Sequence, residues 1–309
     1  MKVGLFLPQE SHAREAIEAY ETMTRVAQEA EALGFSSVWL FDHMNSIYQP
    51  DKLLFECWMS VAALARDTRR VRIGQVVTCN GFRNPALLAK MASTVDVLSH
   101  GRLEVGIGAG WHEQECHAYG FPFPDTPTRL RQLREAVTIL KALWTQEHVH
   151  FEGRYYRVQG AINQPKRVQH PHIPLLIGGK GEQITLRLVA RYANACNFTH
   201  LSLEELQHKF SLLEQYCEEY GRDPGEIRHT IFVNGVLAAT DEQAHAIVTG
   251  GPGKFSPEEM RVRGLLGSPM TVRQRLNKLE QAGVDEVIVS LHSVTKREPL
   301  RLLAEAFAA

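Results

Sequence analysis

Short apolar runs rich in β-branched residues alternate along the chain with longer stretches in which apolar residues recur every three to four positions. The first pattern predicts strands, and the second predicts helices that pack one face against a core. Because the two patterns alternate, we expect βαβ units that build a parallel sheet. The predicted strands span residues 3–7, 37–41, 71–78, 103–107, 174–177, 195–198, 228–237 and 286–290.

Eight strands, each followed by a helix, suit a closed (β/α)8 TIM barrel, since closure leaves no exposed edge strand. The outer helices are predicted from apolar stripes at helical spacing. The two clearest stripes are Met23, Val26, Ala27, Ala30 and Leu33, and Leu130, Leu133, Val137, Leu140 and Trp144. Because α/β barrels reach this length without splitting, we expect a single domain over residues 1–309.

Three helix starts carry residues that favour N-capping. Thr126 and Ser268 each precede a proline, which suits the first helical position. Ser202, with Glu205 three residues later, has the pattern of a capping box. These residues predict where the helices begin.

Two segments break the alternation. Residues 148–158 alternate polar and apolar side chains around a glycine, which predicts a small β-hairpin inserted before the fifth strand. Residues 249–267 begin with a glycine-rich run and predict a loop insertion between the seventh and eighth strands. Such an insertion at a barrel mouth either shapes a substrate pocket or lid, or is a surface loop.

Composition narrows the class of protein. The 34 Lys and Arg residues nearly balance 35 Asp and Glu, which argues against a nucleic-acid partner. No stretch reaches the ~18 apolar residues of a membrane span, and the N-terminal apolar run is too short for a secretion signal, so we expect a cytoplasmic protein with no membrane partner. The five cysteines form no C-x-x-C pair, and His112 and Cys116 lack further ligands at suitable spacing, so no metal site is expected.

In a barrel of this type, the functional side chains follow the carboxyl ends of the strands. The second strand is followed by Asp42 and His43. An imidazole placed there is suited to proton transfer near neutral pH, although the same histidine could instead cap a helix or pair with a carboxylate. His43 is therefore the candidate catalytic residue.

The ends of the third and fourth strands are rich in small residues. Thr78, Cys79 and Asn80 lie at the end of the third strand, where small side chains would let a flat ring approach the backbone. The fourth strand runs through a G-x-G-x-G pattern to Gly110 and Trp111. This spacing and its late position do not fit a Rossmann fingerprint, so the run is interpreted as backbone that passes close to a ligand, with Trp111 as a wall of the pocket.

The fifth strand ends in a glycine-rich turn that leads directly into a helix. The turn contains Gly178, Gly179, Gly181 and Glu182. Unpaired amides at the positive end of a helix dipole can hold a phosphate, which makes this turn the best anion site in the sequence. The alternative is a tight turn that binds no ligand.

Taken in order along the chain, these strand ends resemble the bacterial luciferase-like monooxygenase family. The motifs are Asp42-His43, Val77-Thr78-Cys79 with Arg83 and Pro85, Gly106 to Trp111, Ile177-Gly178-Gly179, Phe151 to Tyr156, and Ala282 to Glu286. The form of the run from Gly108 to Trp111 is most similar to members that use the deazaflavin coenzyme F420. The resemblance covers nearly the whole chain.

The resemblance implies roles for individual residues. Asp42 would contact the cofactor, and His43 would donate a proton or lie beside the substrate. A non-proline cis peptide around Thr78, Cys79 and Asn80 would lie behind the ring. Further cofactor contacts would come from Ala109, Gly110, Gly178, Gly179, Gly181 and Glu182. The glucose-6-phosphate dehydrogenases of the family carry a catalytic Glu where this chain has Trp111, so that reaction is not expected here.

The function expected from the sequence is hydride transfer between coenzyme F420 and a small organic substrate, with His43 handling the proton. One alternative is an FMN-dependent monooxygenase on the same barrel. A second alternative, of another class, is a non-catalytic protein that binds a flavin or deazaflavin. Members of the family are often dimers, so a homodimer is also expected.

Overall fold

Eight parallel strands form a closed barrel, as the sequence predicts. The structure is a computed structural model that describes residues 1–11, 13, 15–47, 49, 51–250 and 255–308. The barrel strands are β1 (Lys2–Phe6), β3 (Ser37–Leu40), β5 (Arg72–Gln75), β7 (Leu103–Gly108), β10 (Leu175–Gly178), β11 (Ala195–Thr199), β12 (Arg228–Leu237) and β14 (Glu286–Leu291). They are ordered β10-β11-β12-β14-β1-β3-β5-β7, and pairing of β7 with β10 closes the ring.

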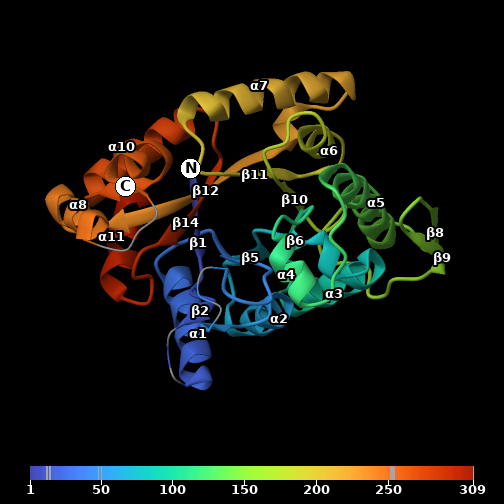
Figure 1. Cartoon of the computed structure of the whole chain (residues 1–309), viewed down its shortest axis with the longest axis horizontal. Helices are drawn as coiled ribbons and strands as arrows, with labels where there is room; N and C mark the ends of the chain where they lie inside the picture. The colour runs from blue at the N-terminus through green and yellow to red at the C-terminus, as the bar shows by residue number, and fades with distance from the viewer. Residues whose placement is uncertain (12, 14, 48, 50, 251–254, 309) are drawn as a thin grey trace.

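Helices surround the strands, as Figure 1 shows. The helices that connect successive barrel strands are α1 (Ala16–Ala32), α2 (Cys57–Asp67), α3 (Pro85–Leu98), α5 (Thr126–Thr145), α6 (Thr185–Tyr192), α7 (Leu203–Glu219) and α10 (Pro269–Gln281), and α11 (Arg297–Phe307) follows the last strand. The two apolar stripes predicted from the sequence lie on α1 and α5, and eight of their ten residues are buried. The described helices include none that is both long enough and apolar enough to cross a bilayer.

The apolar core has two layers. The larger layer lies between the strands and the helices. A smaller cluster inside the barrel contains Trp39, Leu176, Ala195 and Ile288. Val76 and Val77 pack against this inner cluster, which places them beneath the mouth of the barrel.

The third strand is not continuous over residues 71–78 as predicted. β5 ends at Gln75, a non-proline cis peptide joins Val76 to Val77, and β6 (Thr78–Cys79) then pairs with the end of β7. The cis peptide therefore lies before the Thr78, Cys79 and Asn80 positions that the resemblance implied. A short 3-10 turn, η1 (Asn80–Phe82), leads on to α3.

The predicted hairpin is present as β8 (Val149–Glu152) paired antiparallel with β9 (Arg157–Ala161). Glu135 on α5 holds its turn, because the Glu135 carboxylate accepts the amides of Arg154, Tyr155 and Tyr156 at 2.9, 3.0 and 3.1 Å. A Cβ on Gly153 would overlap the same carboxylate, which explains the glycine in the turn.

The second insertion is more ordered than the predicted loop. Residues 251–254 lie outside the described residues, but residues 255–267 contain α9 (Pro257–Arg263) and β13 (Leu265–Gly267), after α8 (Asp241–Gly250). A capping box between Ser256 and Glu259 starts α9, and β13 adds to the carboxyl half of β12. Two short strands elsewhere, β2 (Glu10–Ser11) and β4 (Leu53–Leu54), pair antiparallel.

The predicted N-caps are correct at Ser202 and Ser268 and wrong by one residue at α5. Asp125 caps α5 by accepting the Thr128 amide at 2.8 Å, and Thr126 is the first helical residue. A carboxylate satisfies the same free amide that a threonine hydroxyl would, so the local pattern alone did not separate the two neighbours.

Candidate active site

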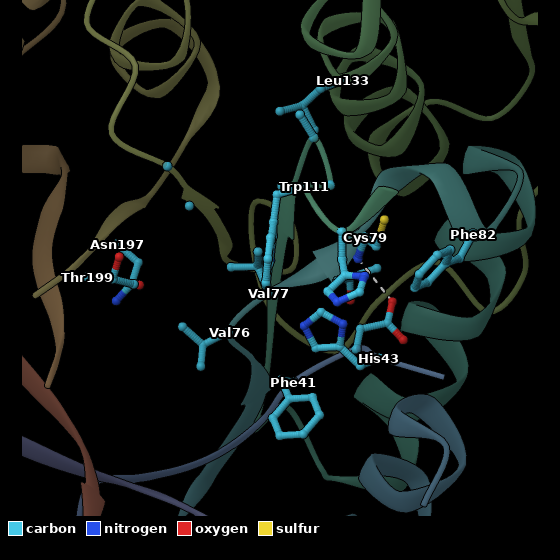
Figure 2. Close-up of a pocket in the computed structure, with 18 of the residues that line it drawn as sticks. Phe41, His43, Val76, Val77, Cys79, Phe82, Trp111, Leu133, Asn197 and Thr199 are labelled. Atoms are coloured by element: carbon cyan, nitrogen blue, oxygen red, sulfur yellow. Dashed lines mark hydrogen bonds between the residues drawn. The ribbon is translucent and has the colours of Figure 1, made fainter. Parts of the chain in front are cut away.

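A pocket of about 330 Å³ lies at the carboxyl ends of the strands, with lining residues drawn in Figure 2. Its lining comes from the carboxyl ends of β7, β10 and β11, from the residues that follow β3, β5, β7 and β10, and from α4, α5 and α6. Nine residues predicted from the sequence line it: Asp42, His43, Thr78, Cys79, Ala109, Gly110, Trp111, Gly178 and Gly179. The strand-end residues predicted from the sequence therefore meet in one cavity.

His43 is held by a carboxylate that the sequence analysis missed. Its Nδ1 atom lies 2.8 Å from Glu115 Oε2, and the other Glu115 oxygen accepts the Met44 amide at 2.5 Å. Glu115 belongs to α4 (Glu113–Ala118), an additional short helix between β7 and α5. Trp111 packs edge-on against His43 with 5.9 Å between ring centroids, and Trp111 itself is 62% exposed.

The Glu115 carboxylate stays ionised. Burial acts to raise its pKa, but the hydrogen bonds from His43 and from the Met44 amide outweigh burial and lower the pKa below the ordinary glutamate value. The side chain is only 2% exposed, so these bonds are shielded from water. An ionised carboxylate has no proton to give, and its partner nitrogen must therefore carry one.

Asp42 does not have a free carboxylate. Arg83 Nη1 lies 2.6 Å from Asp42 Oδ2 and Nη2 lies 3.1 Å from Oδ1, while the Cys79 amide donates to Oδ2 at 3.0 Å. Burial alone would lower the pKa of Arg83, but the carboxylates of Asp42 and Glu56 raise it, so the guanidinium remains charged. The pair fixes the backbone at Cys79, where burial raises the pKa of the thiol to about 12.

Glycines on two strands make room for the path of the third strand. A Cβ on Gly106 would overlap the carbonyl oxygen of Gln75, and a Cβ on either Gly108 or Gly178 would lie 2.8 Å from a methyl group of Val77. The glycines after the fourth and fifth strands are predicted from the sequence to leave room for a ligand. At Gly106 the space is taken by the Gln75 carbonyl. At Gly108 and Gly178 it is taken by Val77, which forms the floor of the pocket with Val76.

The glycine-rich turn after β10 leaves amides without partners, though not all of the predicted ones. The Gly179 amide donates to the carbonyl of Asn197 at 3.2 Å and is not available to a ligand. Within the described residues, the amides of residues 180–183 donate to no acceptor, and Lys180 forms no ion pair. The free donors thus begin one residue later than Gly179, at the entry to α6.

Three residues predicted to bind the cofactor do not line the pocket. Asn80 is buried and donates to the Tyr156 hydroxyl of the hairpin at 3.2 Å. Glu182 points to α7, where Lys209 and His208 donate to it. The Gly181 backbone faces Thr185, because a Cβ there would lie 3.0 Å from the Thr185 hydroxyl.

Other lining residues were not predicted: Phe41, Glu115, Lys180, Thr185, Asn197 and Thr199. Phe41, Asn197 and Thr199 could have been identified because each lies at a predicted strand end. Glu115 carries no such signal, since it follows a strand by seven residues and its link to His43 is formed only in the folded chain.

The chain matches the model of a family described as luciferase-like monooxygenase over residues 1–256. It is 35% identical over 167 residues to an uncharacterised protein of Mycobacterium tuberculosis, covering 54% of this chain and 57% of that protein. It is 32% identical over 244 residues to an F420-dependent glucose-6-phosphate dehydrogenase of Intrasporangium calvum, covering 71% of each. The alignment with the first of these relatives thus spans little more than half of its length.

The fold is also that of a solved structure described as an F420-dependent secondary alcohol dehydrogenase in complex with an F420-acetone adduct. The two chains superpose with a TM-score of 0.84 at 22% identity, over 99% of this chain and 98% of the other. At this identity the likeness supports the barrel architecture.

Proposed function

Because the chain belongs to the luciferase-like monooxygenase family, we propose that it is an oxidoreductase that uses coenzyme F420 and a small organic substrate. The observation that carries this proposal is that His43 and the glycine-rich turn after β10 line the same pocket. The first can move a proton, and the second can hold a phosphate. The F420-dependent dehydrogenase among the relatives favours the deazaflavin over other redox cofactors.

The pocket fits a ring system joined to a phosphate. Val76 and Val77 form an apolar floor with no charged atom, on which a flat ring can lie. Lys180 lines the pocket, and its free amide and its ammonium offer donors to a phosphate near the start of α6. When bound, the deazaflavin supplies the hydride acceptor or donor.

The residues of the chain then orient the reactants and handle the proton. His43 presents Nε2 to the pocket, because its Nδ1 is held by Glu115. This nitrogen takes the substrate proton that accompanies hydride removal, or returns it in the opposite direction. Trp111 forms a wall beside the imidazole and narrows the space for the substrate. The resemblance described under Sequence analysis implies that glucose-6-phosphate dehydrogenases of the family carry a catalytic Glu at the position of Trp111, so we propose a different small substrate.

The competing function is that of an FMN-dependent monooxygenase, which the description of the family favours. The two are separated by titrating the protein with F420 and with FMN while following tryptophan fluorescence. Trp111 lines the pocket, so tryptophan fluorescence should fall when a cofactor binds, and Trp111→Phe should reduce that change. Tighter binding of FMN than of F420 would contradict the deazaflavin proposal.

Replacement of His43 tests the proton-transfer role. His43→Ala should lower kcat by about 100-fold or more while the Kd of the cofactor stays unchanged, because general acid–base catalysis contributes on the order of 10²–10⁴ in rate. The matched control is His117→Ala, which removes an exposed imidazole from α4. Equal turnover of His43→Ala and the control would remove His43 from the mechanism. Binding of the cofactor without turnover in the wild-type protein would instead favour a non-catalytic binding protein.

A further inference from the structure

α4 lies against the segment that carries His43 and is fastened to it at three points. Glu115 contacts both the His43 ring and the Met44 amide, and the Tyr119 hydroxyl donates to the Met44 carbonyl at 3.2 Å. The His112 ring caps the start of α4 by accepting the Glu115 amide at 3.1 Å. The helix thus places one carboxylate at the Nδ1 edge of the imidazole.

Glu115 requires a hydrogen-bond donor on each of its two partners, the Met44 amide and His43 Nδ1. The Met44 amide is always a donor, and the Glu115 carboxylate has only acceptor oxygens. His43 Nδ1 must then carry a hydrogen to make its 2.8 Å contact, and in the neutral ring Nε2 keeps the lone pair. Within the described residues, Nε2 has no hydrogen-bond partner, and the ring lines the pocket.

We propose that Glu115 is a positioning residue that sets the tautomer of His43, so that Nε2 faces the substrate as a proton acceptor. This inference rests on the proposed function for its effect on turnover. The claim about the tautomer can be tested independently of the proposed function, because the tautomer of His43 can be measured without any cofactor. Glu115 acts through the imidazole and needs no contact with substrate.

Glu115→Gln distinguishes this role from a purely structural one. A glutamine amide has one oxygen to accept and one NH2 group to donate, whereas its two partners in the native arrangement are both donors. The Met44 amide cannot change, so the glutamine oxygen should remain on Met44 and the NH2 group should face His43. Nδ1 must then become the acceptor, and the hydrogen moves to Nε2.

The experiment is nitrogen-15 NMR of the ring nitrogens in histidine-labelled protein without ligand, with His43→Ala used to assign the signals. In the wild-type protein, Nδ1 of His43 should give the protonated signal and Nε2 the unprotonated one. In Glu115→Gln the two signals should exchange. The reverse assignment in the wild-type protein would overturn the proposal without recourse to any variant that fails to fold.

Turnover provides the second measurement. Glu115→Gln should lower kcat by about 100-fold, comparable with loss of the base itself, with no change in the Kd of the cofactor. The control is Glu113→Gln, which removes the same charge from an exposed position on the same helix. A Glu115→Gln variant that keeps both the wild-type tautomer and wild-type kcat overturns the proposal. If no substrate is turned over with F420 or FMN, the proposed function fails, while the NMR result still decides the role of Glu115.

Discussion

The contact between Gly178 and Val77 predicts that these two positions are coupled in stability. An added Cβ at Gly178 would lie 2.8 Å from Val77 Cγ1 and 3.4 Å from Cγ2. A valine side chain is branched at Cβ and has little freedom to turn away. Gly178→Ala should therefore force the floor of the pocket to shift.

The size of the effect follows from two opposing contributions. Overpacking of this kind typically costs about 1–3 kcal/mol, and replacing a strand glycine by alanine returns about 0.5–1 kcal/mol of chain entropy. We therefore expect Gly178→Ala to lower the free energy of unfolding by about 1–2 kcal/mol. Val77→Ala removes both methyl groups and leaves only Val77 Cβ, at 3.7 Å from the new atom, which is an ordinary contact.

A double-mutant cycle measured by chemical denaturation checks this reasoning. Gly178→Ala should lower the free energy of unfolding less in the Val77→Ala background than in the wild type. The coupling free energy between the two positions should be about 1–3 kcal/mol. Val76→Ala is the matched control, because Val76 is the adjacent valine and the three atoms nearest to the added Cβ all belong to Val77. A coupling no larger than that obtained with Val76→Ala would show that the contact does not govern the packing of the floor.

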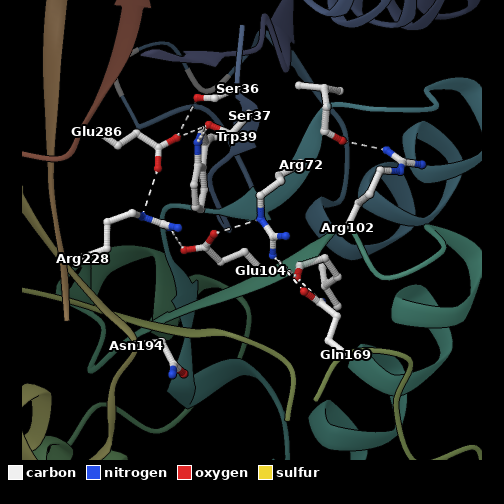
Figure 3. A network of polar contacts seen from close by, with 12 residues as sticks. Ser36, Ser37, Trp39, Arg72, Arg102, Glu104, Gln169, Asn194, Arg228 and Glu286 are labelled. Atoms are coloured by element: carbon white, nitrogen blue, oxygen red, sulfur yellow. Dashed lines mark hydrogen bonds and ion pairs between the residues drawn. The ribbon is translucent and has the colours of Figure 1, made fainter. Parts of the chain in front are cut away.

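Two further predictions concern parts of the fold outside the pocket. Glu135→Ala should destabilise the protein by about 2–4 kcal/mol and raise hydrogen exchange selectively at the amides of residues 154–156, since it removes the acceptor of all three; uniform exchange across the chain would contradict this. At the opposite end of the barrel, Arg228 pairs with Glu104 and Glu286, both at most 3% exposed (Figure 3). Arg228→Met should cost about 3–5 kcal/mol at neutral pH because it removes the guanidinium shared by two buried carboxylates and leaves Glu104 with Arg72 alone, at 3.5 Å; burial already raises the pKa of Glu104. The difference in free energy of unfolding between Arg228→Met and the wild type should shrink as the pH falls, because protonation of Glu104 removes a negative charge that has lost Arg228. A difference that does not change with pH would refute this account.

The barrel itself was predictable because its signals are local. Each strand was recognised from a short apolar run, and all eight predictions overlap the observed strands. The hairpin followed from alternation around Gly153, and the outer helices followed from their apolar stripes. These patterns depend on burial: β3 and β7 are buried on both faces and appear as short apolar runs, whereas the outer helices are buried on one face and show a stripe.

The predictions failed where the structure depends on contacts between distant segments. The third strand reads as one run over residues 71–78, but its path is interrupted at Val76 and Val77, where glycines of β7 and β10 leave space for it. The order in residues 255–267 likewise comes from pairing of β13 with β12 and from the capping box of α9, a helix too short to stand out by its periodicity.

The site shows the same division between local and distant signals. His43 could be proposed as the catalytic residue because it follows a strand directly, where barrels of this type place their active residues. The carboxylate that controls it is 72 positions away in sequence and lies on a helix outside the eight-fold repeat. The end of a strand can place an imidazole at the mouth of the barrel, but it does not determine which ring nitrogen carries the hydrogen. The tautomer depends on a hydrogen-bond partner from another segment of the chain. In this chain α4 provides that group through Glu115, so the proposed role of His43 depends on the inserted helix as much as on the strand end.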